Sequence, residues 1–151
     1  MKKVLLTVLV FLVANNLLAN QQGISVQFGH DSERQLSLTH SYPMDETTAV
    51  IFGVGENFGT SGSSFEGKLG LSKNFSILEK ISSIVKVSLG TGLYNKTASD
   101  NRTGYGLLEL SGGIEGKLSD TYTLELGIVE RVFIFRETKL PAPYVGLNFS
   151  F

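Results

Sequence analysis

Hydrophobic and polar residues alternate along most of this chain. In the stretch 144–151, Val145, Leu147 and Phe149 fall on one side of an extended strand, while Gly146 and Asn148 fall on the other. Each of the strands that this period predicts has one apolar face and one face of small or polar residues. The pattern recurs upstream, and it predicts eight β-strands, at 24–28, 35–42, 48–55, 65–72, 79–93, 104–118, 122–132 and 144–151.

The connectors between these strands alternate in character. Short turns are expected at 41–47, 72–76 and 118–121, and polar loops are expected at 30–34, 56–64, 94–103 and 136–143. This order predicts an all-β fold, an eight-stranded antiparallel up-and-down transmembrane β-barrel with periplasmic turns and outer loops. The chain is too short for sixteen membrane-crossing strands, which excludes a large porin. One residue, Glu130, interrupts an apolar face and predicts a bulge or an exposed strand end.

The first residues have the pattern of a secretory signal peptide. Lys2 and Lys3 precede an apolar run at 4–13 that only Thr7 interrupts. The run is shorter than the roughly 20 residues of a membrane-spanning helix. We therefore predict a signal peptide at 1–19, with cleavage within a few residues of Ala19, and a barrel domain at 20–151. No cysteine follows the run, which excludes a lipoprotein anchor.

The inward face of the predicted barrel carries equal numbers of acids and bases. An eight-stranded barrel is just wide enough for its side chains to fill it, so these charges are expected to pair instead of lining a water channel. Paired carboxylates acting in acid/base catalysis are the functional alternative. The charged set comprises Glu66, Lys68, Lys86, Glu109, Glu115, Lys117, Glu125 and Arg131.

Composition narrows the range of chemistry further. The formal net charge is −1, so the chain has no excess of positive charge with which to bind a nucleic acid. The absence of cysteine excludes disulfides, thiolate metal sites and a cysteine nucleophile. No metal-ligand cluster or phosphate-binding loop is found in the sequence, so no metal and no cofactor is expected.

The two histidines define the possible nucleophilic sites. His30 and Ser32 fall in the first predicted outer loop, where a lipid-modifying hydrolase or acyltransferase could use them. His40 and Ser41 are adjacent on a strand, so their side chains point to opposite faces and make a poor catalytic pair. The late-strand His-x-Ser arrangement of the lipid A deacylase family is absent. A non-enzymatic barrel is the leading hypothesis, and a secreted soluble barrel that binds an apolar ligand is a further alternative.

Aromatic residues are expected to form two girdles at the membrane boundaries. The girdle at the turn ends would contain Tyr42, Phe75, Tyr122, Phe149 and Phe151. The girdle toward the loop ends would contain Phe58, Phe65, Tyr94, Tyr105, Phe133 and Phe135.

The end of the sequence resembles the C-terminal signal of bacterial outer-membrane barrels, Gly-x-x-apolar-x-Phe. Gly146, Phe149 and Phe151 carry the resemblance, although Val145 replaces the usual polar residue before the glycine. The resemblance implies recognition by the barrel-assembly machinery. Taken as a whole, the chain is similar in architecture to small outer-membrane barrels such as OmpX and the OmpA transmembrane domain. That similarity implies location in the cell outer membrane, contact with its lipid and lipopolysaccharide, and a role in envelope integrity, adhesion or host interaction, without naming an extracellular partner.

Overall fold

Eight antiparallel β-strands make up the part of the chain that the computed structural model describes, residues 21–28, 34–59, 62–96, 102–134 and 139–150. The predicted signal peptide at 1–19 lies outside these residues. No helix among them is long and apolar enough to cross a membrane. The strands are β1 (Gln21–Phe28), β2 (Arg34–Pro43), β3 (Thr48–Gly59), β4 (Gly62–Leu78), β5 (Ile81–Lys96), β6 (Arg102–Lys117), β7 (Tyr122–Ile134) and β8 (Lys139–Ser150).

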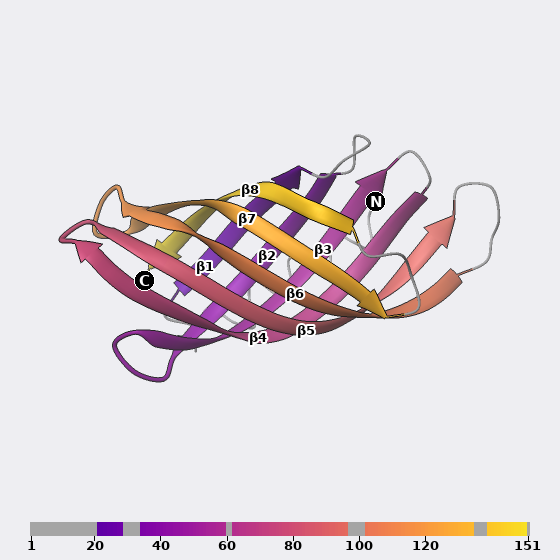
Figure 1. Cartoon of the computed structure of the whole chain (residues 1–151), viewed down its shortest axis with the longest axis horizontal. Helices are drawn as coiled ribbons and strands as arrows, with labels where there is room; N and C mark the ends of the chain where they lie inside the picture. Colours follow the sequence, from indigo (N-terminus) through magenta and orange to yellow (C-terminus); the bar gives the residue numbers. More distant parts are fainter. Residues whose placement is uncertain (1–20, 29–33, 60–61, 97–101, 135–138, 151) are drawn as a thin grey trace.

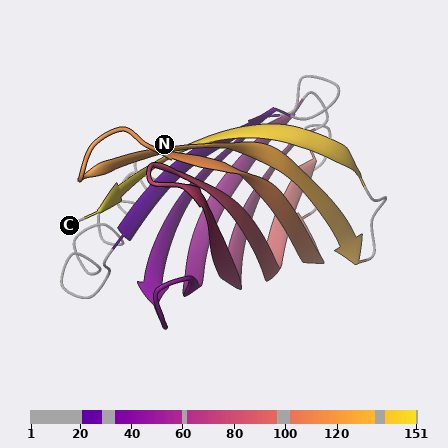
Figure 2. The same cartoon turned by 60° about the vertical axis from the view of Figure 1, so that its left-hand side comes forward.

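Each strand pairs with the next, and β8 closes the barrel by pairing with β1 (Figures 1 and 2). The closing register places Gln21 opposite Ser150 and Val26 opposite Val145. Closure leaves no open edge, so every strand has a hydrogen-bonded neighbour on both sides. The predicted antiparallel up-and-down barrel of eight strands is confirmed.

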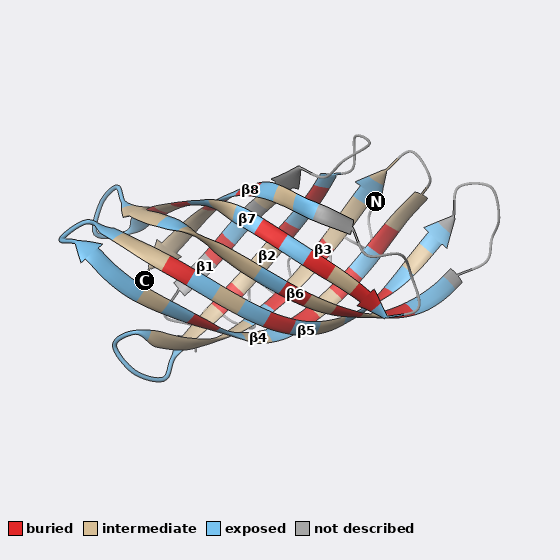
Figure 3. Ribbon diagram, in the orientation of Figure 1, coloured by how far each residue is buried: buried red, intermediate tan, exposed pale blue. Residues whose placement is uncertain are grey.

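The barrel has its polar face inside and its apolar face outside, which is the reverse of the arrangement in a soluble protein. Buried positions alternate with exposed ones along the strands, as the bands in Figure 3 show. Polar and charged side chains such as Ser37, Glu66 and Glu125 are buried inside, whereas Leu69, Leu89 and Ile128 are exposed outside. The two-residue period therefore assigns the polar face of each strand to the interior, which we call the lumen.

The strands are longer than the sequence predicted. The segment 56–64, predicted as a loop, is strand except for residues 60–61, which lie outside the described part. Asn57 and Ser64 pair across β3 and β4, and Asn57 Nδ2 donates to Ser64 Oγ at 2.9 Å. These polar residues face the lumen, where a barrel strand carries them, and so they resemble a loop in sequence. The turn predicted at 72–76 likewise lies later, because β4 continues to Leu78.

The interruption predicted at Glu130 coincides with an irregularity between β7 and β8. Val129 pairs with Ala142, while Arg131 pairs with Lys139, so β8 carries an extra residue over this interval. Pro141 lies in the same interval and has no N–H to contribute to a ladder. The irregularity therefore lies beside Glu130, with the extra residue on β8, while Glu130 itself pairs regularly with Leu110 on β6 and is exposed on the outward face.

The girdle at the turn ends is supported by aromatic contacts. The Tyr122 and Phe149 rings pack edge to face with centroids 5.4 Å apart, and the Lys73 ammonium lies 5.9 Å from the Phe75 ring. At the loop ends, Phe58 and Phe65 are exposed outward, as predicted. Phe135 and Phe151 lie outside the described residues.

Three members of the predicted loop-end girdle do not face outward. Tyr105 and Phe133 are buried in the lumen, and the partly buried Tyr94 packs against them and Leu107. The girdle prediction was wrong for these three aromatics, because Tyr105 and Phe133 share the inward alternation of Glu109 and Arg131 on the same strands.

Candidate functional site

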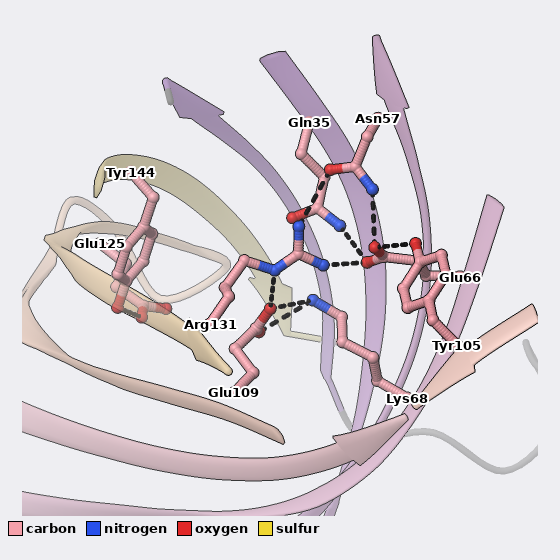
Figure 4. A network of polar contacts seen from close by, with 9 residues as sticks. All are labelled: Gln35, Asn57, Glu66, Lys68, Tyr105, Glu109, Glu125, Arg131 and Tyr144. Carbon is pink, nitrogen blue, oxygen red and sulfur yellow. Dashed lines mark hydrogen bonds and ion pairs between the residues drawn. The ribbon is translucent and has the colours of Figure 1, made fainter. Parts of the chain in front are cut away.

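The lumen contains an ion network centred on Arg131, which projects from β7 (Figure 4). Its Nη2 pairs with Glu66 Oε2 on β4, and its Nε lies 3.2 Å from Glu109 Oε2 on β6. Its Nη1 donates to Asn57 Oδ1 at 3.1 Å. The planar guanidinium presents donors along several directions, so one side chain links strands from opposite sides of the barrel.

Lys68 extends the network on the other side of Glu109. Its Nζ lies 2.8 Å from Glu109 Oε1 and 2.9 Å from Oε2. Glu109 therefore shares its negative charge between Lys68 and Arg131, and both of its carboxylate oxygens accept hydrogen bonds. Because charges are expensive to bury unless each is paired and hydrogen-bonded, this shared pairing is what allows the interior to hold them.

Glu66 is completely buried and fully satisfied. Asn57 Nδ2 and the Tyr105 hydroxyl donate to Oε1 at 2.7 and 2.5 Å, and Gln35 Nε2 donates to Oε2 at 2.8 Å, beside Arg131. A carboxylate has about four acceptor positions, and four donors occupy them here. The uncharged members Gln35, Asn57 and Tyr105 were not recognised in the sequence, although all three share the inward alternation.

A second, smaller cluster surrounds Glu125 on β7. Lys86 Nζ lies 2.6 Å from Glu125 Oε2, the Tyr144 hydroxyl donates to Oε1, and Asn148 Nδ2 donates to Oε2 at 3.3 Å. Lys86 also lies 5.9 Å from the Tyr144 ring. The two clusters together contain three acids and three bases, so the paired part of the lumen is electrically neutral.

An aromatic layer lies in the lumen on the loop side of the Arg131 network. The Tyr105 and Phe133 rings pack edge to face at 5.4 Å, and Leu107 is buried with them. Arg131 lies beneath this layer, with its guanidinium carbon 5.2 Å from the Phe133 ring. We call Tyr94, Tyr105, Leu107 and Phe133 the aromatic cap.

The lumen is hollow toward the turn ends. A cavity of about 340 Å³ lies between the β2–β3 turn and Lys86, and Ser72, Glu115 and Thr123 are among its lining residues. We call it the turn-end cavity. A second void of only about 40 Å³ lies deeper, bordered by Ser37, Lys68 and Lys86. The interior therefore changes from an open polar cavity at one end to a packed ion network and an aromatic cap at the other.

Two of the eight predicted lumen charges form no ion pair with members of these clusters in the described part of the chain. Glu115 lines the turn-end cavity and makes no ion pair with any residue of the described ranges. Lys117 is half exposed at the end of β6 and pairs with Asp120 in the adjacent turn at 3.0 Å. The prediction that Lys117 belongs to the buried network is therefore not what the structure shows, because β6 ends there and its side chain reaches the turn.

The other candidate residues are not members of the two lumen clusters or lie outside the described residues. Gly146 is buried on the inward face of β8 and Phe149 packs on Tyr122, while Phe151 is not among the described residues. His30 and Ser32 also lie outside them. His40 belongs to the outward alternation of β2 and is only 1% exposed, and the neighbouring Ser41 lines the turn-end cavity.

The β2–β3 turn is held by Asp45, outside the spanning strands. Its Oδ1 accepts from the Thr47 and Thr48 N–H groups at 2.8 and 2.7 Å. These backbone hydrogen bonds, that of Thr47 first, hold the pKa of the Asp45 carboxyl below its usual range because they stabilise the charged form. No group of three or more His, Asp or Glu residues in the described part of the chain could hold a metal ion.

Comparison with known proteins identifies the fold. No family model matches the chain, and no curated protein matches its sequence. Among solved structures, it is similar to the N-terminal β-barrel domain of Pseudomonas aeruginosa OprF, with a TM-score of 0.71 and 12% identity over 88% of this chain and 98% of that one. Neisserial surface protein A gives a TM-score of 0.62 and 8% identity over 87% and 94%.

The outer-membrane enzyme PagL is a further structural neighbour, with a TM-score of 0.51 and 9% identity over 85% of this chain and 97% of that one. At sequence identities this low, structural similarity supports a shared fold but not a shared activity, since one fold serves many functions. The chain has the eight-stranded barrel fold that these outer-membrane proteins share.

Proposed function

We propose that the protein is an integral outer-membrane barrel without enzymatic activity, which has a structural role in the envelope or a role in surface interactions. The observation that carries the proposal is the reversed polarity of the barrel. Leu89 is 65% exposed on the outside while Glu66 is 0% exposed inside. A soluble barrel that binds an apolar ligand would place its apolar residues in the interior, so this distribution favours lipid as the outer solvent.

The orientation follows from the two ends of the barrel. Gln21 and Ser150 pair beside the tight turns of the structure, so the first and last strands begin and end on the turn side. Outer-membrane barrels have their short turns on the periplasmic side. We therefore assign the turn ends and the turn-end cavity to the periplasm and the opposite connectors to the exterior.

The packing of the lumen favours a closed barrier across the barrel instead of an open pore. The Arg131 network and the aromatic cap occupy the half of the interior away from the turns, and the void between Lys68 and Lys86 measures only about 40 Å³. Purified protein in planar bilayers is expected to show no large steady conductance. Stable openings of porin size would contradict the proposal.

Fractionation tests the membrane location directly. The mature chain is expected in the outer-membrane fraction, to be released by detergent, and to change its gel mobility on boiling as closed barrels do. Contact with outer-membrane lipid and lipopolysaccharide and insertion by the barrel-assembly machinery belong to the same proposal. Recovery of the chain from the soluble periplasm without detergent would defeat it.

The lipid-modifying alternative depends on His30 and Ser32, and the likeness to PagL concerns the fold only. Comparing lipid A mass spectra of cells with and without the protein tests for such an activity. Identical spectra are expected. A modified lipid A that reverts in the His30→Ala variant would replace the proposed function with an enzymatic one.

A further inference from the structure

The lining of the turn-end cavity includes three carboxylates, Asp45, Glu46 and Glu115, against one base, Lys86. Glu115 projects into it without an ion pair to any described residue, unlike Glu66, Glu109 and Glu125, which each contact a cation. The cation of this cavity, Lys86, already lies 2.6 Å from Glu125. Among the lumen carboxylates of the described ranges, Glu115 is thus the one without a cationic partner.

A second acceptor faces the same space. Asn74 lines the cavity together with Glu115. Asn74 Oδ1 is buried and has no hydrogen-bond partner among the described residues. A buried carbonyl oxygen without a donor is unfavourable, so this atom and the carboxylate call for the same kind of group.

The shape of the cavity limits the size of that group. Its volume of about 340 Å³ lies at the lower end of the range for small-molecule sites. Ile51 and Ile84 contribute an apolar wall, while Ser72 and Thr123 contribute buried hydroxyl groups. The lining comes from the lumen and the β2–β3 turn, so entry is from the turn end and not from the lipid face.

We propose that the turn-end cavity binds a small soluble primary ammonium compound. The ammonium carries three N–H donors and a positive charge. It pairs with the Glu115 carboxylate and donates to Asn74 Oδ1, while its short carbon chain packs on Ile51 and Ile84. The site is separate from the Arg131 network, and its occupancy does not require the lumen to open.

Binding can be measured by titrating the refolded, isotope-labelled barrel in detergent micelles with n-propylammonium chloride and recording amide chemical shifts. Saturable shifts are expected at the strand residues around Ser72, Glu115 and Thr123, with a dissociation constant of about 1 mM or weaker because the probe is small. Sodium chloride at equal ionic strength and 1-propanol, which has the chain without the charge, are expected to give no saturable shifts. Saturation with either control would overturn the ammonium assignment.

Two variants test the residues. Glu115→Gln keeps the shape of the side chain and removes its charge, and it is expected to weaken binding about tenfold or more. Thr123→Leu fills the cavity and is expected to abolish binding even where the charge is intact. Glu79→Gln changes an exposed turn carboxylate outside the cavity and serves as the matched control with unchanged affinity.

Further outcomes decide between related occupants. Equal propylammonium affinity of the parent and Glu115→Gln would refute the proposal. Calcium ions that bind the parent saturably, displace propylammonium and no longer bind Glu115→Gln would also refute it, because the site would then be a cation site. Nanodiscs with phosphatidylethanolamine and with phosphatidylcholine are expected to give the same propylammonium affinity. Competition by phosphatidylethanolamine alone would assign the site to a lipid headgroup instead of a soluble amine. Boiling-dependent gel mobility verifies that each variant is folded.

Discussion

Arg131 and Glu66 meet in the lumen although 65 positions separate them along the chain, and they join β7 to β4 across the barrel. Strands that are not hydrogen-bonded to each other are linked in this way by side chains alone. Removing Arg131 would leave the buried carboxylates of Glu66 and Glu109 with less positive charge to offset the cost of their burial. The ion network should therefore contribute to the stability of the whole barrel.

The first prediction concerns this network. Arg131→Met is expected to lower the free energy of unfolding by about 3–5 kcal/mol, the range for breaking a buried ion pair on one side. Urea titration of the refolded barrel followed by far-UV circular dichroism measures it, since the chain has no tryptophan. Lys117→Met breaks the exposed pair with Asp120 and should change the same quantity by no more than about 0.5 kcal/mol. Equal effects would show that the buried network is not what stabilises the barrel.

The second prediction separates a hydrogen bond from aromatic packing in the cap. Tyr105→Phe removes the hydroxyl that donates to Glu66 at 2.5 Å and keeps the ring against Phe133. The free energy of unfolding should fall by about 1.5–3 kcal/mol, as for other hydrogen bonds to charged groups. Tyr122→Phe is the matched control, because its ring packs on Phe149 and lies exposed at the turn end. A loss in the control as large as in Tyr105→Phe would contradict this account.

The third prediction tests lipid contact by depth. Leu126 is half exposed on the outward face of β7, and Leu118 is exposed in the β6–β7 turn. In lipid vesicles, Leu126→Arg should destabilise the folded barrel by about 2–4 kcal/mol and Leu118→Arg by about 0–1 kcal/mol, because the charge is unfavourable only within hydrocarbon. Equilibrium unfolding in vesicles gives both values. Similar small losses at both positions would mean that the outward face does not contact lipid.

The fourth prediction concerns a close approach at Gly127. A Cβ at this position would lie 2.5 Å from the Gly112 carbonyl oxygen and 2.7 Å from Tyr144 Cε1. Gly127→Ala should therefore displace the Tyr144 ring from Glu125 and destabilise the barrel by about 1–3 kcal/mol, as overpacking does. Gly67→Ala adds the same methyl group where nothing lies within 4 Å, and it should leave the unfolding midpoint unchanged. Unfolding in urea compares the two variants directly.

The fifth prediction concerns the last strand. Deleting Phe151 should reduce the amount of folded barrel in the outer membrane without affecting export, because β8 must close against β1 and an unclosed barrel leaves unpaired backbone groups in hydrocarbon. Phe151→Ser should act in the same way, while Ser150→Thr keeps a hydroxyl and should be nearly silent. Gel mobility of the membrane fraction before and after boiling gives the folded yield. Normal yield from the deletion would exclude Phe151 from the assembly signal.

The sequence alone was sufficient for the number of strands, their order and the inward face of the charged residues. These features depend on a two-residue period, which is a local property of an extended backbone. The same alternation could have placed Tyr105 and Phe133 in the lumen, because they share it with Glu109 and Arg131. The expectation that aromatics lie at the membrane boundary hid this signal. Inward-facing polar residues such as Asn57 were likewise taken for a loop.

Only the tertiary structure decided which charges pair and where the lumen stays open. Alternation selects the inward residues, but the partner of Arg131 depends on how the strands are staggered around the closed ring, and that stagger sets which side chains meet at one height. Glu115 and Glu125 are both acids on inward positions of neighbouring strands, yet Glu125 contacts Lys86 while Glu115 borders the turn-end cavity. Their different surroundings arise from contacts across the barrel, which no local pattern contains.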